Sequence, residues 1–115
     1  MNTEIELIRK FNITSRYKGY YLLPEAIQIA IENYGCCLKI TKDIYPVLAQ
    51  RHGIPYKRVE RNIRTVIEKC WENNRTFMEE IAGKELEICP TNGQFFDFVA
   101  YWMLKNSESG KGKSV

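Results

Sequence analysis

The spacing of apolar residues along the chain predicts helices almost throughout. In most segments they recur every three or four positions, as on the buried side of an amphipathic helix. Residues 84–90 alternate polar and apolar, but a single strand would have no partner, so we expect an extended loop there. The helices predicted on this basis cover residues 3–12, 20–34, 55–72, 75–82 and 92–105, with one more beginning near Pro46.

The start of that remaining helix has two readings. Thr41 could cap it, but Pro46 would then lie inside the helix, remove one backbone donor and press on the preceding turn. Either the regular helix begins near Pro46 or its first turn is irregular. The chain is therefore predicted to be a compact all-α domain of six helices over residues 1–105, followed by a disordered Ser/Gly/Lys tail over residues 106–115.

Residues 41–68 have the spacing of a helix-turn-helix. Ala49 is small where the first helix would cross the second, four residues before Gly53. Gly53 accepts the positive φ of a tight turn. Val59, six residues after that glycine, begins the buried stripe of the second helix.

The second helix of this motif has two different sides. Its apolar stripe consists of Val59, Ile63, Val66, Ile67 and Cys70. The opposite side carries Lys57, Arg61, Arg64 and Glu68, with Glu60 on its flank. Arginine pairs with guanine O6 and N7, and glutamate accepts from cytosine N4, which is the chemistry of a recognition helix. The alternative is an ordinary solvated amphipathic helix.

Charge is concentrated on the same segment. The 115 residues, 44% of them hydrophobic, suffice for one domain with its own core, and the net charge is only +3. Between Lys39 and Arg75, however, nine Lys or Arg stand against four Asp or Glu, compared with 17 against 14 in the whole chain. This distribution is typical of phosphate binding, although a chance fluctuation is an alternative for counts this small.

No feature indicates an enzyme, a cofactor or a membrane protein. The four cysteines match no zinc spacing, and His52, beside the turn glycine, is the only histidine, so we expect free thiols and no metal. No phosphate-cradling glycine loop is present. No apolar run approaches membrane-spanning length and no secretory signal is seen, so we expect a cytoplasmic protein.

The last predicted helix is rich in aromatic residues. They either complete the core or contact another subunit, because large exposed apolar patches usually mark interfaces. The residues expected at such a subunit contact are Phe96, Tyr101 and Trp102.

Several of these elements together resemble the C-terminal DNA-binding domain of the stage zero sporulation protein A family, the sporulation-initiation response regulators. The resemblance covers residues 3–104. It rests on the run from Arg58 to Arg64 (Arg-Val-Glu-Arg-x-Ile-Arg) and on the sequence distances between this run and the other matching pieces. Those pieces are Lys18-Gly19-Tyr20, Pro24-Glu25-Ala26-Ile27, Ile40-Thr41-Lys42, Tyr45-Pro46, Ile67-Glu68, Trp71, Pro90-Thr91-Asn92 and Phe95.

The resemblance implies a six-helix domain whose helix-turn-helix enters the major groove of a promoter box of the TGTCGAA type. It implies that two copies bind head to tail on adjacent boxes, with the last helix at the subunit contact. It also implies a contact with the sigma subunit of RNA polymerase around the short fifth helix. Family regulators carry an N-terminal receiver domain, for which these residues leave no room, so we expect a stand-alone relative or a fragment.

These observations predict a sequence-specific regulator that binds double-stranded DNA. The residues expected to read base edges are Arg58, Glu60, Arg61 and Arg64, which the resemblance places at the groove. The residues expected to hold phosphates are Lys42, Arg51 and Lys57. The alternative is a protein-interaction module that pairs with a full-length regulator or with RNA polymerase and does not read DNA itself.

Overall fold

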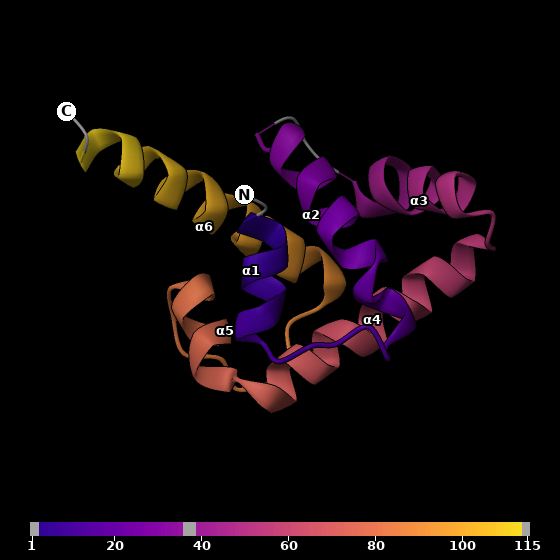
Figure 1. Cartoon of the computed structure of the whole chain (residues 1–115), viewed down its shortest axis with the longest axis horizontal. Coiled ribbons are helices and arrows are strands. Elements are labelled where there is room, and N and C mark those ends of the chain that lie inside the picture. The colour runs from indigo at the N-terminus through magenta and orange to yellow at the C-terminus, as the bar shows by residue number, and fades with distance from the viewer. Residues whose placement is uncertain (1–2, 36–38, 114–115) are drawn as a thin grey trace.

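A computed structural model describes residues 3–35 and 39–113, and this part of the chain is helical, with no β-strand. The all-α prediction with six α-helices is confirmed over these residues. The α-helices are α1 (Thr3–Lys10), α2 (Leu22–Glu32), α3 (Tyr45–His52), α4 (Tyr56–Asn73), α5 (Arg75–Ala82) and α6 (Asn92–Lys113) (Figure 1). Two short elements precede α2 and α3: a 3-10 turn, η1 (Lys18–Tyr20), and a π-helical turn, η2 (Ile40–Ile44).

The helices pack around one hydrophobic core. α2 packs against α6, α4 and α1, while α4 runs along one side of the domain from α3 to α5 (Figure 1). Aromatic rings join three helices, since the Phe77 ring of α5 lies 4.9 Å from that of Phe11, the residue after α1, and 5.7 Å from that of Trp102 in α6, measured between centroids. No helix in the described ranges is both long and apolar enough to cross a membrane.

α1 ends at Lys10, two residues earlier than predicted. Asn12 has a φ of 56°, a left-handed conformation that asparagine tolerates. The Asn12 N–H donates to the Arg9 carbonyl and the Ile13 N–H to the Ile8 carbonyl, which is the hydrogen-bond pattern of a Schellman cap. Local hydrogen bonding therefore ends the helix although the apolar periodicity continues through Phe11.

The helix-turn-helix forms as its spacing predicts. Gly53 has a φ of 63°, and the N–H of Ile54 donates to the Ala49 carbonyl at 3.1 Å. Both expectations for Pro46 apply, because regular α3 begins at Tyr45 with the proline in its first turn, and the preceding η2 is irregular. At the far end of α4, Asn74 ends that helix and its side chain accepts from the N–H of Phe77 to cap α5.

The start of α6 is capped reciprocally. The Thr91 hydroxyl accepts from the Gln94 backbone N–H at 3.1 Å, and the side-chain oxygen Oε1 of Gln94 accepts from the Thr91 N–H at 3.0 Å. Before it, residues 84–90 form neither helix nor strand, which confirms the predicted loop.

The end of α6 corrects the sequence prediction. The helix continues to Lys113 rather than ending near residue 105, and it projects from the body of the domain (Figure 1). Once a helix is nucleated, each further residue adds a backbone hydrogen bond, so it can extend past its apolar stretch. The disorder expected for residues 106–115 on composition stays a prediction.

Gly19 lets η1 pack directly on α4. A Cβ at this position would lie 2.4 Å from the Asn62 carbonyl oxygen and 2.5 Å from Val66 Cγ2, and backbone atoms of a helix cannot move aside cheaply. The local sequence gives no sign of this role, because no positive φ requires a glycine at position 19. The requirement is steric and comes from a helix more than forty positions further along the chain.

We expect Gly19→Ala to lower the free energy of unfolding by about 1–3 kcal/mol, because the added methyl group overpacks the contact between η1 and α4. Denaturant titration measures the change. Ser15→Ala, at an exposed position nearby, is the control and should stay within about 0.5 kcal/mol of the original protein. Equal stability of the two variants would contradict the steric argument.

Candidate nucleic-acid interface

α4 buries the stripe that the sequence predicts. Val59, Ile63, Val66, Ile67 and Cys70 each have 0% of their surface exposed. Burial also raises the pKa of the Cys70 thiol, so this cysteine is a neutral apolar group of the core. Because the buried stripe fixes the rotation of α4 about its axis, it also decides which side chains face outward.

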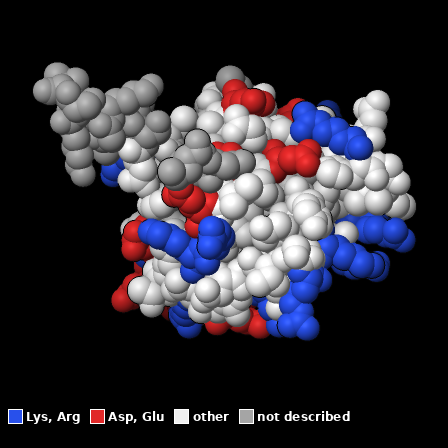
Figure 2. All heavy atoms as spheres, in the orientation of Figure 1, with Lys and Arg blue, Asp and Glu red and all other residues white. Residues whose placement is uncertain are grey.

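The outward side of α4 presents cations that the protein does not neutralise. Lys57, Arg58 and Arg61 are exposed, and none has a carboxylate within 4.0 Å among the residues the structure describes. Near the other end of the helix, by contrast, Lys69 is paired with Glu72 at 3.1 Å. Figure 2 shows Lys and Arg gathered along the edge of the molecule beside the first half of α4.

An open groove of about 860 Å³ lies between α4 and the start of α6. One wall carries the charged side chains of the recognition helix. The other wall is the short segment that opens α6, with the Tyr45 ring between the two. The lining residues are Tyr45, Lys57, Glu60, Arg61, Arg64, Thr65, Glu68, Thr91, Asn92 and Gly93. The groove thus combines cations, two carboxylates and hydroxyl groups, which are the group types that proteins use to contact nucleic acid.

Arg64 is oriented differently from its sequence prediction. We expected its guanidinium to project outward, but Nη1 donates to the Pro90 carbonyl at 2.6 Å and to Asn92 Oδ1 at 3.3 Å. Its Nε also pairs with Glu68 at 3.2 Å, and the side chain is only 33% exposed. Arg64 is held against the start of α6 because the Pro90 carbonyl and the Asn92 side chain lie beside α4 and accept from its guanidinium.

A buried polar contact extends this link to α3. Asn92 Nδ2 donates to the Tyr45 hydroxyl at 2.7 Å, and both residues are largely buried. Burial raises the pKa of the Tyr45 phenol, and the hydrogen bond from Asn92 opposes part of that rise. Sequence periodicity could not reveal this hydrogen-bond network, because Tyr45, Arg64 and Asn92 come from three different helices.

The expected phosphate-binding residues differ in their surroundings. Lys57 faces the groove, whereas Lys42 lies exposed in η2 and outside it. Arg51 Nη1 pairs with Glu25 at 3.2 Å, and the other oxygen of Glu25 lies 2.9 Å from Nε2 of His52. Arg51 remains 55% exposed, and such surface pairs contribute little stability, so the pair leaves its guanidinium accessible.

The aromatic residues of α6 are not equivalent. Phe96 is fully buried, which corrects the expectation that it meets another subunit: it completes the core instead. Trp102 is partly buried against Phe77. Tyr101 is 50% exposed, with its ring centroid 6.1 Å from that of Tyr34. Helical periodicity alone does not separate these residues, because burial depends on which helices cover α6.

Two of the four cysteines, Cys36 and Cys37, lie outside the described residues. Cys70 and Cys89 are free thiols, and burial raises the pKa of Cys89 while the guanidinium of Arg64 opposes the rise.

The family model for the C-terminal domain of the sporulation initiation factor Spo0A matches residues 5–103. The chain belongs to this family. The Spo0A C-terminal domain is a DNA-binding effector domain of a response regulator, a regulatory rather than a catalytic domain. The helix-turn-helix of α3 and α4 is therefore part of a DNA-binding regulatory domain, and the match covers the groove and its flanks.

In this Spo0A-type domain, we expect Arg64→Met to lower the free energy of unfolding by about 1–3 kcal/mol, since it leaves the Pro90 carbonyl and Asn92 without their donor. Arg61→Met is the matched control: the chemical change is the same, but the side chain is exposed and has no ion pair with any described residue, so stability should change by less than about 0.5 kcal/mol. Thermal or denaturant unfolding measures both. A loss for Arg61→Met as large as that for Arg64→Met would contradict the link.

Tyr45 makes stability depend on alkaline pH. Its folded pKa is raised above the ordinary value of about 10, so the phenol keeps its proton longer in the folded than in the unfolded state. This contribution to stability is complete below pH of about 10 and is lost as pH rises through the folded pKa. We expect Tyr45→Phe to unfold with a shallower loss of stability above pH of about 10 than the original protein, measured by denaturant titration at a series of pH values. Identical slopes would show that the phenol does not titrate differently on folding.

Proposed function

We propose that the chain binds double-stranded DNA in a sequence-specific way, with α4 in the major groove. The observation that carries this is the exposed side of α4, where Lys57, Arg58 and Arg61 have no ion pair among the described residues and where Lys57 and Arg61 line an open groove. Unpaired surface cations are the groups that attract a phosphate backbone, and a major groove about 12 Å wide admits a helix. Membership of a DNA-binding family supports the same conclusion.

Within this interface we propose a division of labour. Arg58, Glu60 and Arg61 read or flank base edges, since all three are exposed on the outward side of α4. Lys57 holds phosphates together with Lys42 and Arg51, which position the domain without specifying sequence.

Arg64 receives a different role in this proposal. To reach a base it would have to leave Pro90, Asn92 and Glu68. We therefore assign it to positioning: it fixes the start of α6 against α4, and so sets the shape of the groove in which Arg61 lies.

We also propose that two copies bind adjacent boxes head to tail, as the family resemblance implies, with α6 at the contact. Tyr101 is the aromatic residue best placed for it, because half of its surface is free. Trp102 contributes its exposed edge. The sigma-subunit contact implied for the region around α5 stays a prediction.

The test begins with an unbiased selection of bound duplexes from a random pool, which establishes binding and returns the preferred box. We then expect Arg61→Ala to weaken binding to the selected box by about 1–3 kcal/mol while binding to unrelated duplexes changes little. Lys57→Ala should weaken binding to all duplexes similarly and reduce the salt dependence.

Lys84→Ala, a substitution of an exposed lysine two residues after the end of α5, is the control for lost charge. Equal losses on selected and unrelated duplexes for Arg61→Ala would rule out base reading by that residue. Indifference of the original protein to every duplex at low ionic strength would reject the proposed function.

A further inference from the structure

The segment that links α1 to α2 runs along α4 in the opposite direction. At one end, Asn73 Nδ2, in the last turn of α4, donates to the Phe11 carbonyl at 3.0 Å. At the other end, Gly19 lies against Asn62, early in α4. Figure 1 shows this indigo segment following α4 over that distance. A stretch far from the recognition helix in sequence is therefore its direct neighbour in space.

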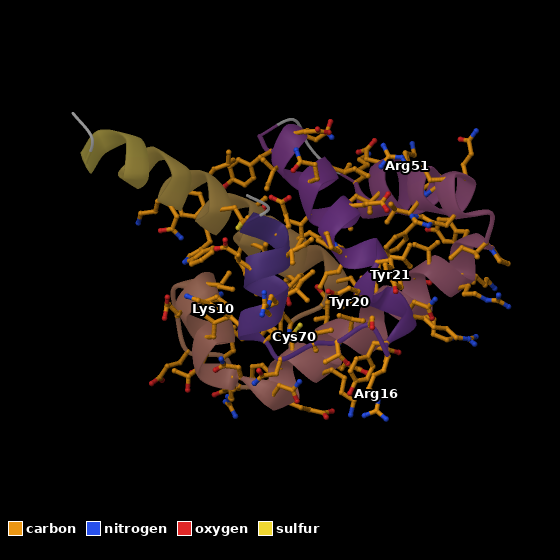
Figure 3. The ribbon with its side chains drawn as sticks, viewed as in Figure 1. Lys10, Arg16, Tyr20, Tyr21, Arg51 and Cys70 are labelled. Atoms are coloured by element: carbon orange, nitrogen blue, oxygen red, sulfur yellow. The ribbon has the colours of Figure 1, made fainter. Side chains whose placement is uncertain are left out.

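Because Gly19 has no side chain, the segment that links α1 to α2 packs directly on α4. This close packing places Lys18 at the edge of α4. Lys18 and Arg58 both line a hollow of about 330 Å³, together with Tyr21 and His52. Two residues earlier, Arg16 lies exposed beside α4 and points away from the protein body (Figure 3). The segment thus adds two cations along one flank of the recognition helix.

Like Lys57, Arg58 and Arg61 of α4, these two cations form no ion pair with the described residues. Neither Arg16 nor Lys18 has a carboxylate within 4.0 Å in the described part of the chain. His52, which lines the hollow, contacts the carboxylate of Glu25, and that carboxylate also pairs with Arg51. A phosphate approaching Lys18 would therefore meet positive charge without displacing an ion pair.

The placement of this segment matches that of a DNA backbone. A helix with its side chains is about 10–12 Å across, which is comparable with the width of the major groove. When such a helix occupies the groove, an element packed on the side of the helix lies over one of the phosphate backbones that border the groove. On α4 the start of α6 covers one flank and the segment around η1 covers the other. We propose that Arg16 and Lys18 form a second phosphate-binding element, which holds the DNA backbone beside the recognition helix. This inference rests on the proposed DNA binding and adds a part of the interface that the helix-turn-helix does not supply.

The test compares Lys18→Gln, the double variant Arg16→Gln/Lys18→Gln and the control Lys84→Gln, which removes the same charge at the end of α5. Each full-length variant is titrated with the selected box and with an unrelated duplex, between about 50 and 200 mM salt. We expect Lys18→Gln to weaken binding to both duplexes by the same factor, about threefold to tenfold. The slope of log affinity against log salt should become shallower by about one for Lys18→Gln and about two for the double variant. Lys84→Gln should bind as the original protein does.

The remaining outcomes separate this inference from the proposed function. If the original protein binds its box and Arg61→Ala weakens it, but Lys18→Gln keeps the original slope, the inference is overturned and the proposed function stands. A loss restricted to the selected box, or an equal loss in Lys84→Gln, also overturns it, since the first indicates base reading and the second a general effect of net charge.

Saturable binding of inorganic phosphate at Lys18 without DNA, followed by amide NMR shifts around Gly19, would assign a free-anion site instead. Equal thermal unfolding temperatures for all variants exclude a folding defect.

Discussion

Burial of one side of α4 is the constraint on which the rest of the domain depends. Val59, Ile63 and Ile67 are completely enclosed, so the helix cannot turn about its axis without exposing part of this stripe. A shift of one residue would rotate it by about 100° and bring a charged side chain into the core. The hydrophobic effect therefore acts on the function indirectly: by burying one side of the helix, it holds Arg58 and Arg61 in water, where a duplex can reach them.

The flanks of α4 are held by two different kinds of contact. On one flank, the Arg64 guanidinium binds the Pro90 carbonyl and Asn92, and Asn92 in turn binds Tyr45. On the other flank, the absence of a side chain at Gly19 lets a backbone lie directly on the helix. The first contact is a hydrogen-bond network that needs all of its members to keep its polar groups paired. The second contact depends only on the space that a missing side chain leaves. Together they decide what stands on either side of the recognition helix.

The distribution of ion pairs is as informative as the net charge. Several arginines and lysines are paired with carboxylates on their own surface, among them Arg51 with Glu25 and Arg75 with Glu79. Among the described residues, Lys57, Arg58 and Arg61 of α4 and Arg16 and Lys18 of the adjoining segment have no such pair. A net charge of +3 gives little reason to expect a phosphate partner, whereas unpaired cations collected around one helix do.

Local sequence determined much of this protein. The 3.6-residue period located the helices, Gly53 and its spacing to Ala49 located the turn, and the stripe from Val59 to Cys70 identified the inward side of α4, because each of these signals arises within a few turns of chain. Helix ends were less predictable, as α1 and α6 show, since capping and helix propagation act beyond the apolar pattern.

Only the tertiary structure decided the fates of Arg64, Phe96 and Gly19. An arginine on the polar side of a helix looks free until another helix places a carbonyl beside it. An aromatic residue on α6 looks available until the core closes over it. A glycine looks like a turn residue until a distant backbone occupies the space of its side chain. In each case the deciding atoms lie far away in sequence, and periodicity carries no information about them.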